Sequence, residues 1–278
     1  MIVDAHHHLW NPARGDYGWM PKDDPVLART YRLADAMREF DANGIGQAVI
    51  VQAAPTTAET EYMLGIADSS DRIAGVVGWI DFENHAERTQ LEHFAAHEKF
   101  RSVRPMVQDI ADDDWVLRAD INWAFDALRD LDLAFDALGF PRHMPRFLEI
   151  FQRYPELRIV IDHCFKPEIR NNAFDDWARQ MEQIAKQTSV FCKLSGLVTE
   201  AGNGVDAETL RPYVNHVIEA FGPDRIMWGS DWPVCRLRCE YGDWLAMARA
   251  LTAHLDDSAQ EALFRTTAQR FYRLPATA

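Results

Sequence analysis

The chain has 278 residues, of which 47% are hydrophobic, and its formal net charge is −14 at pH 7. This composition is typical of a globular protein with a sizeable core, and an acidic chain without a basic stripe is a poor candidate for binding nucleic acid or an anionic membrane. No apolar run approaches the roughly 20 residues that cross a bilayer, and no charged-then-apolar leader precedes Ile2. The four cysteines lack the spacing of a metal site or a disulfide framework. We therefore expect a cytoplasmic protein with reduced thiols.

The first segment is a short apolar run that ends in three histidines, His6, His7 and His8. In an extended strand alternate side chains face the same way, so His6 and His8 project side by side and His7 points to the opposite face. Two neighbouring imidazoles suit a borderline-soft divalent ion such as zinc. The pattern alone leaves two alternatives open, a metal site and histidines satisfied by ordinary hydrogen bonds.

An irregular segment rich in Pro, Gly, Asp and aromatic residues follows, to about residue 32. A loop of this length inside a compact domain is usually functional. Trp10 and Trp19 give it an aromatic character, which fits a substrate-facing loop or a packed surface loop equally well.

From residue 33 onward, apolar runs of strand length alternate with segments of helical periodicity. After the first segment, we expect strands at residues 48–51, 73–80, 102–107, 133–138, 157–161, 190–194 and 226–228. We expect helices near residues 33–43, 57–67, 86–99, 121–128, 147–154, 177–184, 210–221, 243–254 and 258–272. Gly44 is the expected C-terminal cap of the first helix and Thr57 the expected N-terminal cap of the second.

The order of these elements predicts an α/β fold. Eight continuous apolar strands indicate a parallel sheet buried on both faces, and eight strand–helix units in this length match a (β/α)8 TIM barrel. An open doubly wound sheet is the alternative, but no Gly-x-Gly-x-x-Gly follows the first strand. No linker or low-complexity segment interrupts the pattern, so we expect one domain spanning residues 1–278.

Polar residues stand where the predicted strands end. Groups at the carboxyl ends of barrel strands meet at one rim, and here they are His6, His8, Gln52, Asp81, Arg104, Asp136, His163, Lys193 or Ser195, and Asp231. Four of them are first-choice groups for metal binding or proton transfer: His6, His8, His163 and Asp231. We expect no site role for the histidines of helices and connections, which are His85, His93, His97, His143, His216 and His254.

Five short motifs resemble the amidohydrolase superfamily, and within it the sugar-lactonase branch. They are Asp4-Ala5-His6-x-His8, Asp162-His163 with Lys166-Pro167, Lys193-Leu194-Ser195-Gly196, and Trp228-Gly229-Ser230-Asp231-Trp232-Pro233. The resemblance runs from residue 1 to about residue 273. It implies a distorted (β/α)8 barrel that hydrolyses the cyclic ester of a sugar acid, an aldonolactone such as L-fuconolactone.

The chain departs from the two-metal members of that superfamily at two strands. Those proteins carry a carbamylated lysine on strand four and a histidine on strand five, where this chain has Arg104 and Asp136. We therefore expect at most one divalent ion, zinc, held by His6, His8, His163 and Asp231. Some relatives in this branch work without metal, so the resemblance leaves open whether activity requires the ion.

Opening a lactone requires an activated water and stabilisation of charge on the carbonyl oxygen. Asp231 is the candidate general base, and the alternative is a purely structural role as a helix cap. His163 would polarise the carbonyl or ligate the ion. Arg104, with five donors in a fixed fork, would hold oxygen-rich groups unless it forms a buried structural salt bridge.

Substrate recognition is assigned to a wider set of residues. Gln52, Asp136 and Lys193 are candidates for binding hydroxyl groups, and Trp19 and Trp232 for packing on the apolar face of the sugar ring. Core packing is an equally good explanation for either tryptophan. The sequence leaves open the stereochemistry and ring size of the lactone and whether the chain forms a homo-oligomer.

Two other functions compete with the lactonase. A metal-dependent nonoxidative decarboxylase shares the His-x-His, His and Asp pattern, and a catalytically silent binding protein would keep the scaffold. The Lys193-Leu194-Ser195-Gly196 segment favours the lactonase, whose partner is a small sugar lactone.

Overall fold

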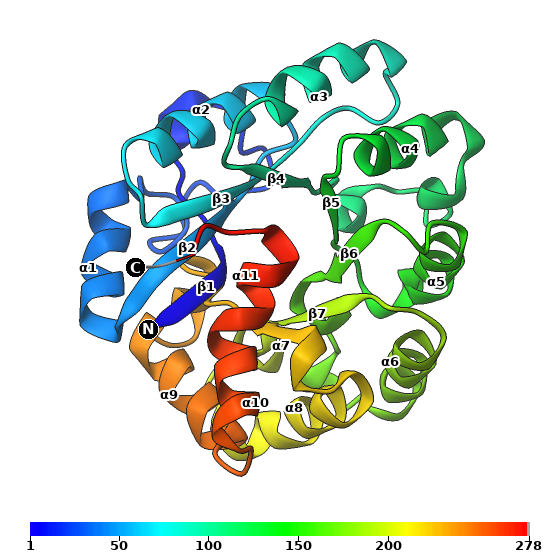
Figure 1. The fold of residues 1–278 in the computed structure, drawn as a ribbon. Helices are drawn as coiled ribbons and strands as arrows, with labels where there is room; N and C mark the ends of the chain where they lie inside the picture. The colour runs from blue at the N-terminus through cyan, green and yellow to red at the C-terminus, as the bar shows by residue number, and fades with distance from the viewer. Residues whose placement is uncertain (277–278) are drawn as a thin grey trace.

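The structure, a computed structural model that describes residues 1–276, is built around eight parallel strands (Figure 1). Neighbours in the sheet follow chain order from β1 to β8, which confirms the predicted (β/α)8 barrel. The strands are β1 (Ile2–His7), β2 (Ile45–Val51), β3 (Ile73–Gly78), β4 (Phe100–Val103), β5 (Ala134–Ala137), β6 (Arg158–Ile161), β7 (Phe191–Leu194) and β8 (Ile226–Trp228).

The ring closes where the segment after β8 meets β1. The backbone N–H of Asp231 donates to the carbonyl of His6 at 2.8 Å, and the N–H of His8 donates to the carbonyl of Trp232 at 2.7 Å. These bonds bring the ends of the first and last strands together, although residues 6 and 231 lie far apart in the chain.

The helices lie around the outside of the barrel, except the last one, α11, which lies in front of the strands in this view (Figure 1). They are α1 (Leu33–Asn43), α2 (Thr57–Asp68), α3 (Arg88–Ala95), α4 (Asn122–Asp130), α5 (Met144–Arg153), α6 (Asp175–Gln187), α7 (Leu197–Ala201), α8 (Ala207–Phe221), α9 (Tyr241–Thr252), α10 (Asp257–Glu261) and α11 (Thr267–Tyr272). Gly44 caps α1 at a φ of 69°, as expected. The short α7 was not predicted, because five residues are too few to show a helical period.

Several boundaries differ from the predictions, and three of them have a local cause. Thr56 rather than Thr57 caps α2, since its side chain accepts a hydrogen bond from the N–H of Glu59. The helix predicted at residues 86–99 is shorter and begins at Arg88 after a single 3-10 turn. The strand predicted at residues 102–107 ends at Val103, close to Pro105, which has no N–H to continue the ladder.

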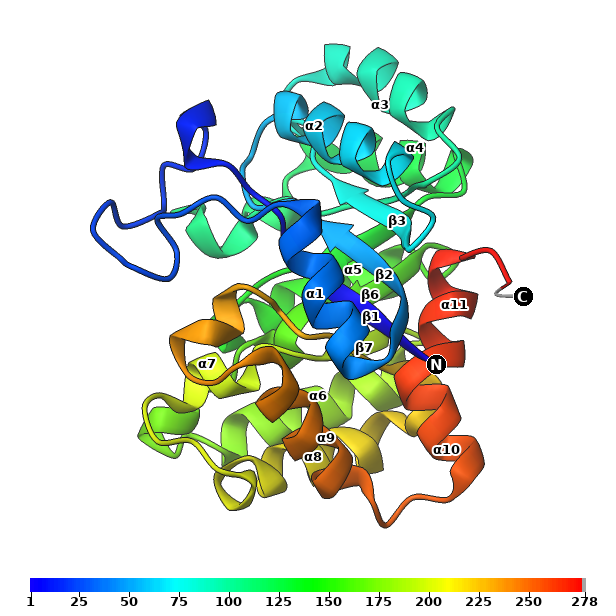
Figure 2. The same ribbon diagram turned by 90° about the vertical axis from the view of Figure 1, so that its left-hand side faces the viewer.

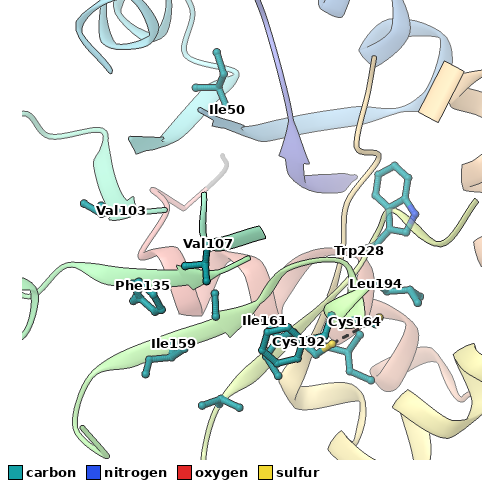
Figure 3. Packing of buried hydrophobic residues seen from close by; sticks show 14 of the residues in the cluster. Ile50, Val103, Val107, Phe135, Ile159, Ile161, Cys164, Cys192, Leu194 and Trp228 are labelled. Carbon is teal, nitrogen blue, oxygen red and sulfur yellow. Dashed lines mark hydrogen bonds between the residues drawn. The ribbon is translucent and has the colours of Figure 1, made fainter. Parts of the chain in front are cut away.

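The apolar residues form two separate cores, one on each face of the strands. Figure 3 shows part of the larger core, where outward side chains such as Ile50 and Ile159 belong to the layer between strands and helices. The smaller core includes Val3, Val49 and Val160 from the strands, and Phe271 and Tyr272 from α11. The C-terminal helix therefore packs against the inner faces of the strands.

The loop after β1 lies at the end of the barrel opposite the chain termini. Figure 2 shows this dark-blue segment, residues 11–32, projecting on the left, with both termini on the right. It is tied down by packing, since the ring of Trp10 meets Tyr31 at 5.6 Å between centroids and its Nε1 donates to the carbonyl of Arg29 at 2.9 Å. No helix among the described residues combines the length and apolarity that a membrane crossing requires.

Candidate active site

A bulge in β1 sets the direction of the three histidines. The pairing of β1 with β2 slips by one residue between Asp4 and His7. His7 then faces outward, where its ring meets Phe40 at 5.3 Å between centroids. His6 and His8 turn together to the opposite side, with their Nε2 atoms 3.2 Å apart. The predicted chelate pair is therefore present, and His7 is excluded from it.

The carboxylate of Asp4 joins the two ends of the barrel beneath this pair. Its Oδ1 accepts hydrogen bonds from the N–H groups of His6 at 3.1 Å and Ser230 at 2.8 Å. Its Oδ2 accepts from the hydroxyls of Ser230 at 2.6 Å and Tyr241 at 2.9 Å. Burial raises the pKa of Asp4 to about 6 despite these bonds. Asp4 thereby fixes His6 relative to the segment that carries Asp231.

His163 lies on a strained turn directly after β6. Four consecutive residues, from His163 to Lys166, have positive φ between 49° and 56°. Each such non-glycine residue costs on the order of 1–3 kcal/mol, and such strain concentrates at functional sites. The turn folds back so that His163 Nδ1 lies 2.8 Å from the hydroxyl of Ser195, at the end of β7.

Two glycines of the motifs make room for the site histidines. A Cβ on Gly196 would lie 2.7 Å from the ring of His163, at a φ of +70° that also disfavours side chains. A Cβ on Gly229 would lie 2.7 Å from the Cβ of His6. The glycines therefore permit the close approach of neighbouring strand ends that the site requires.

The carboxylate of Asp231 lies close to the three predicted histidine ligands. Its Oδ1 lies 3.3 Å from Nε2 of His8, 3.8 Å from Nε2 of His6 and 3.9 Å from Nε2 of His163. Tetrahedral zinc with ligand bonds of about 2.1 Å separates its ligands by about 3.4 Å. Ligand atoms of His6, His163 and Asp231 all lie within 4.8 Å of one another, so these three residues fit a single zinc ion, and His8 lies beside this group but outside it.

The protonation states also suit metal binding. Nδ1 of His8 donates to the carbonyl of Val51 at 2.7 Å, which leaves the lone pair of Nε2 free for an ion. Burial lowers the pKa of His6 well below its ordinary value and lowers that of His163 to about 4, so both rings are neutral at pH 7. Burial alone would raise the pKa of Asp231, but His163 and His8 outweigh it and hold the carboxyl ionised.

A buried ion network lies next to His6. Arg104 donates to Oδ2 of Asp162 at 3.1 Å, and Lys193 Nζ lies 3.0 Å from Oδ1 of Asp162 and 2.5 Å from Oδ2 of Asp136. Lys193 also lies 3.1 Å from Nδ1 of His6. Two cations thus balance two carboxylates, and the charge of Lys193 keeps the pKa of Asp162 well below its usual range, although burial opposes it.

This network places Asp136 and Lys193 away from the positions expected for substrate contacts. Both side chains are fully buried, and Asp136 also accepts hydrogen bonds from Ser102 at 2.6 Å and from Tyr272 at 2.7 Å. Gln52 is likewise buried, and its amide donates to the carbonyl of Arg104 at 2.6 Å. All three hold the barrel interior together, and none of them lines a cavity described next to the site.

The two tryptophans expected at the substrate occupy different environments. Trp232 is buried against Tyr31, with ring centroids 5.0 Å apart, and is absent from the cavity lining. Trp19 is 37% exposed and lines the cavity, where its Nε1 donates to the carbonyl of Ala53 at 2.5 Å. The structure therefore brings only Trp19 to the site.

A cavity of about 110 Å³ opens above the converging ligands. His8, His163 and Asp231 lie on one side of it, and Arg104 and Lys166 supply positive charge. Lys166 is absent from the sequence-based set of site residues, although Lys166-Pro167 belongs to the motifs that carry the family resemblance. Its Nζ donates to the amide oxygen of Gln108 at 2.5 Å, so the cation is held at the cavity wall.

Comparison with known proteins gives a single family over almost the whole chain. The family described as Amidohydrolase matches residues 3–274. An L-fucono-1,5-lactonase of Burkholderia ambifaria is 41% identical over 98% of this chain and 95% of its own length. An L-fucono-1,5-lactonase of Burkholderia multivorans is 34% identical over 99% of this chain and 97% of its own length.

A solved structure is similar over the same extent. The crystal structure of an amidohydrolase from Burkholderia multivorans with bound zinc superposes with a TM-score of 0.92 at 33% identity. The match covers 99% of this chain and all of that one.

Proposed function

This chain belongs to the amidohydrolase family, and on that premise we propose that it opens the lactone of a sugar acid, with L-fucono-1,5-lactone as the first candidate. The observation that carries the proposal is the position of Asp231, whose carboxylate lies within 3.9 Å of three imidazole nitrogens beside a small cavity. Two relatives named for this activity match nearly the full chain, in agreement with the lactonase predicted from the sequence.

Each residue of the site has a separate role in hydrolysis. His6, His8, His163 and Asp231 would hold a zinc ion, and such an ion would supply Lewis acidity and lower the pKa of water toward about 7. Asp231, ionised at neutral pH, accepts the proton of the attacking water and later returns it to the departing ring oxygen. The cations of Arg104 and Lys166 stabilise negative charge that develops on the carbonyl oxygen.

The size of the cavity supports a compact substrate. A space of about 110 Å³ between Trp10, Trp19 and Leu138 holds one small ring. The apolar faces of the two indoles suit the C–H face of a sugar ring, and Arg104 and Gln108 offer donors to its oxygens. Hydroxyl recognition by Arg104 and Gln108 takes the place of the contacts first expected from Gln52, Asp136 and Lys193.

The test is a panel of aldonolactones, simple aliphatic lactones and aromatic acids, assayed for acid release with a pH indicator and for release of carbon dioxide. Sugar lactones should be hydrolysed with the highest kcat/KM, and epimers should differ because unmatched buried polar groups cost about 1–3 kcal/mol each. Release of carbon dioxide from aromatic acids would identify the chain as a decarboxylase instead. No turnover of any compound in the panel would favour a binding protein.

The same panel, repeated after chelation, decides whether the ion is required. Loss of activity that returns with added zinc would assign the ion to catalysis. Full activity without metal would assign charge stabilisation to Arg104, Lys166 and the histidines.

A further inference from the structure

A second and larger cavity adjoins the small one of about 110 Å³ beside His8, His163 and Asp231, which we call the reaction cavity. The larger cavity has a volume of about 500 Å³ and lies beside the ends of β3 and β4. Its walls are mainly aromatic and aliphatic, and we call it the aromatic chamber, lined among others by Trp19, Trp79, Phe82, Met106, Ile110 and Trp115.

Two side chains separate the aromatic chamber from the reaction cavity. Trp19 and Met106 line both spaces, one on each side. Trp19 is held in this position by the hydrogen bond from its Nε1 to Ala53, a residue of the reaction cavity. The two cavities therefore share part of their walls, and a molecule whose ring occupies the reaction cavity would reach the chamber beside Trp19 and Met106.

The walls of the chamber are also ordered. Phe82 and Trp115 are nearly fully buried and their rings pack 5.9 Å apart. Nε1 of Trp115 donates to a carboxylate oxygen of Glu83 at 2.6 Å, and Arg118 pairs with the same oxygen at 2.8 Å. The apolar surface is therefore held open by fixed side chains.

The charged side chains differ between the two cavities. Every ionisable side chain in the described lining of the chamber is acidic, namely Asp16, Asp81, Glu83 and Asp109. The reaction cavity carries the cations Arg104 and Lys166 beside the carboxylate of Asp231. The cations that can stabilise charge on a carbonyl oxygen therefore line the reaction cavity and not the chamber, so a substrate spanning both spaces has its carbonyl in the reaction cavity and an uncharged apolar part in the chamber.

We propose that the aromatic chamber is a binding subsite for an uncharged alkyl or aryl substituent carried on the lactone ring away from the carbonyl. The inference rests on the proposed lactonase function and extends its substrates beyond free sugar lactones. The chamber contributes affinity by burying apolar surface, and each methylene that it buries strengthens binding about fourfold.

The kinetic test compares δ-valerolactone with δ-octalactone, which adds a propyl group next to the ring oxygen. We expect kcat/KM to be about tenfold or more higher for the propyl compound. Ile110→Glu, which puts a charge into the chamber at a partly buried position, should reduce this ratio to about one. Leu148→Glu is the matched control, because Leu148 is equally partly buried and lies on α5 away from the chamber.

A binding test keeps the subsite separate from the proposed function. The neutral fluorophore N-phenyl-1-naphthylamine should bind the full chain and the Leu148→Glu variant, and Ile110→Glu should weaken this binding at least tenfold. Equal binding by all three proteins, or no binding by any, would overturn the subsite even if sugar lactones are hydrolysed.

Two further outcomes have fixed meanings. Probe binding that is lost in Ile110→Glu, in a protein that hydrolyses no lactone, would support the chamber and reject the proposed function. A dimer that dissociates in Ile110→Glu, with no probe bound to the native chain, would assign the chamber to contact between two copies and reject the subsite.

Discussion

At the scale of single residues, the site depends on backbone conformations that most residues avoid. His163 and Asp231 both have positive φ, at 53° and 55°. Asp and His tolerate positive φ better than most residues, but the conformation still costs free energy, so the surrounding packing must hold it. Gly196 and Gly229 belong to this packing, because a methyl group at either position would collide with a site histidine.

Replacing Gly229 by alanine is expected to displace His6 and weaken zinc binding. The added Cβ would lie 2.7 Å from the Cβ of His6 and 3.1 Å from its backbone nitrogen, and neither atom lies at the end of a flexible chain. Calorimetric titration with zinc should show at least a tenfold loss of affinity. Gly65→Ala is the control, since its Cβ meets nothing within 4 Å on α2, and it should bind zinc normally and be more stable by about 0.5–1 kcal/mol.

Asp231→Asn is expected to remove nearly all turnover while leaving the fold intact. The amide keeps the shape of the side chain but cannot accept a proton from water, and general-base catalysis is worth about 10²–10⁴-fold. The measurement compares kcat on the best lactone between the native chain and the variant. Asp176→Asn is the control, because it makes the same substitution at an exposed position on α6. A loss below about tenfold would indicate another base, with His163 next in line.

At the scale of elements, the connection from β2 to α2 positions one wall of the reaction cavity. Oε2 of the buried Glu59 accepts hydrogen bonds from the N–H groups of Ala53 at 2.8 Å and Ala54 at 2.5 Å. Ala53 in turn receives the indole N–H of Trp19. One carboxylate on α2 thus orders the segment that holds the loop aromatic at the site.

The carboxylate of Glu59 makes stability depend on pH. Burial raises its pKa to about 7 from 4.5. Between these two values the folded chain holds a proton that the unfolded chain has lost, so the stability contributed by protonated Glu59 is complete below about pH 4.5 and lost as pH rises through about 7. The total loss is on the order of 3 kcal/mol.

Glu59→Gln should therefore gain stability relative to the native chain as pH rises from 5 to 8. The amide oxygen can keep both backbone hydrogen bonds and carries no charge to bury. Urea unfolding followed by tryptophan fluorescence at the two pH values measures the difference. An unchanged difference between the variants would mean that Glu59 does not titrate in this range.

At the scale of the whole molecule, the barrel brings together groups that lie far apart in the chain. His6, His163 and Asp231 come from the ends of three strands and form one candidate metal cluster within the described residues. Next to it, Arg104 and Lys193 are paired with the carboxylates of Asp162 and Asp136. The organisation as one domain over residues 1–278 and the cytoplasmic location stay predictions.

The purified chain is expected to bind no more than one divalent ion, most strongly zinc. An ion that binds only the folded state at 100 times its Kd stabilises it by about 2.7 kcal/mol, so zinc should raise Tm and a chelator should lower it. Elemental analysis gives the stoichiometry, and two ions per active chain would contradict the prediction. His7→Leu should still bind one ion, because both ring nitrogens of His7 lack partners and face away from the site.

The barrel could be predicted from the sequence alone, and so could a rim where His6, His163 and Asp231 lie close together. Eight apolar runs alternating with helical periods allow few arrangements, and parallel strands must end at a common rim, so polar residues at those ends had to meet. The family and the lactonase chemistry followed from the motifs at the same strand ends.

The partners of Asp136, Lys193 and Gln52 and the position of Trp19 could not be predicted from the sequence and are seen in the tertiary structure. Strands of four residues, buried on both faces, show no alternation that tells which side chain enters the barrel. Lys193 meets Asp136 across 57 positions in the chain, and Lys166 reaches the cavity through a left-handed turn. Such pairings depend on strand register and loop path, which local sequence patterns do not encode.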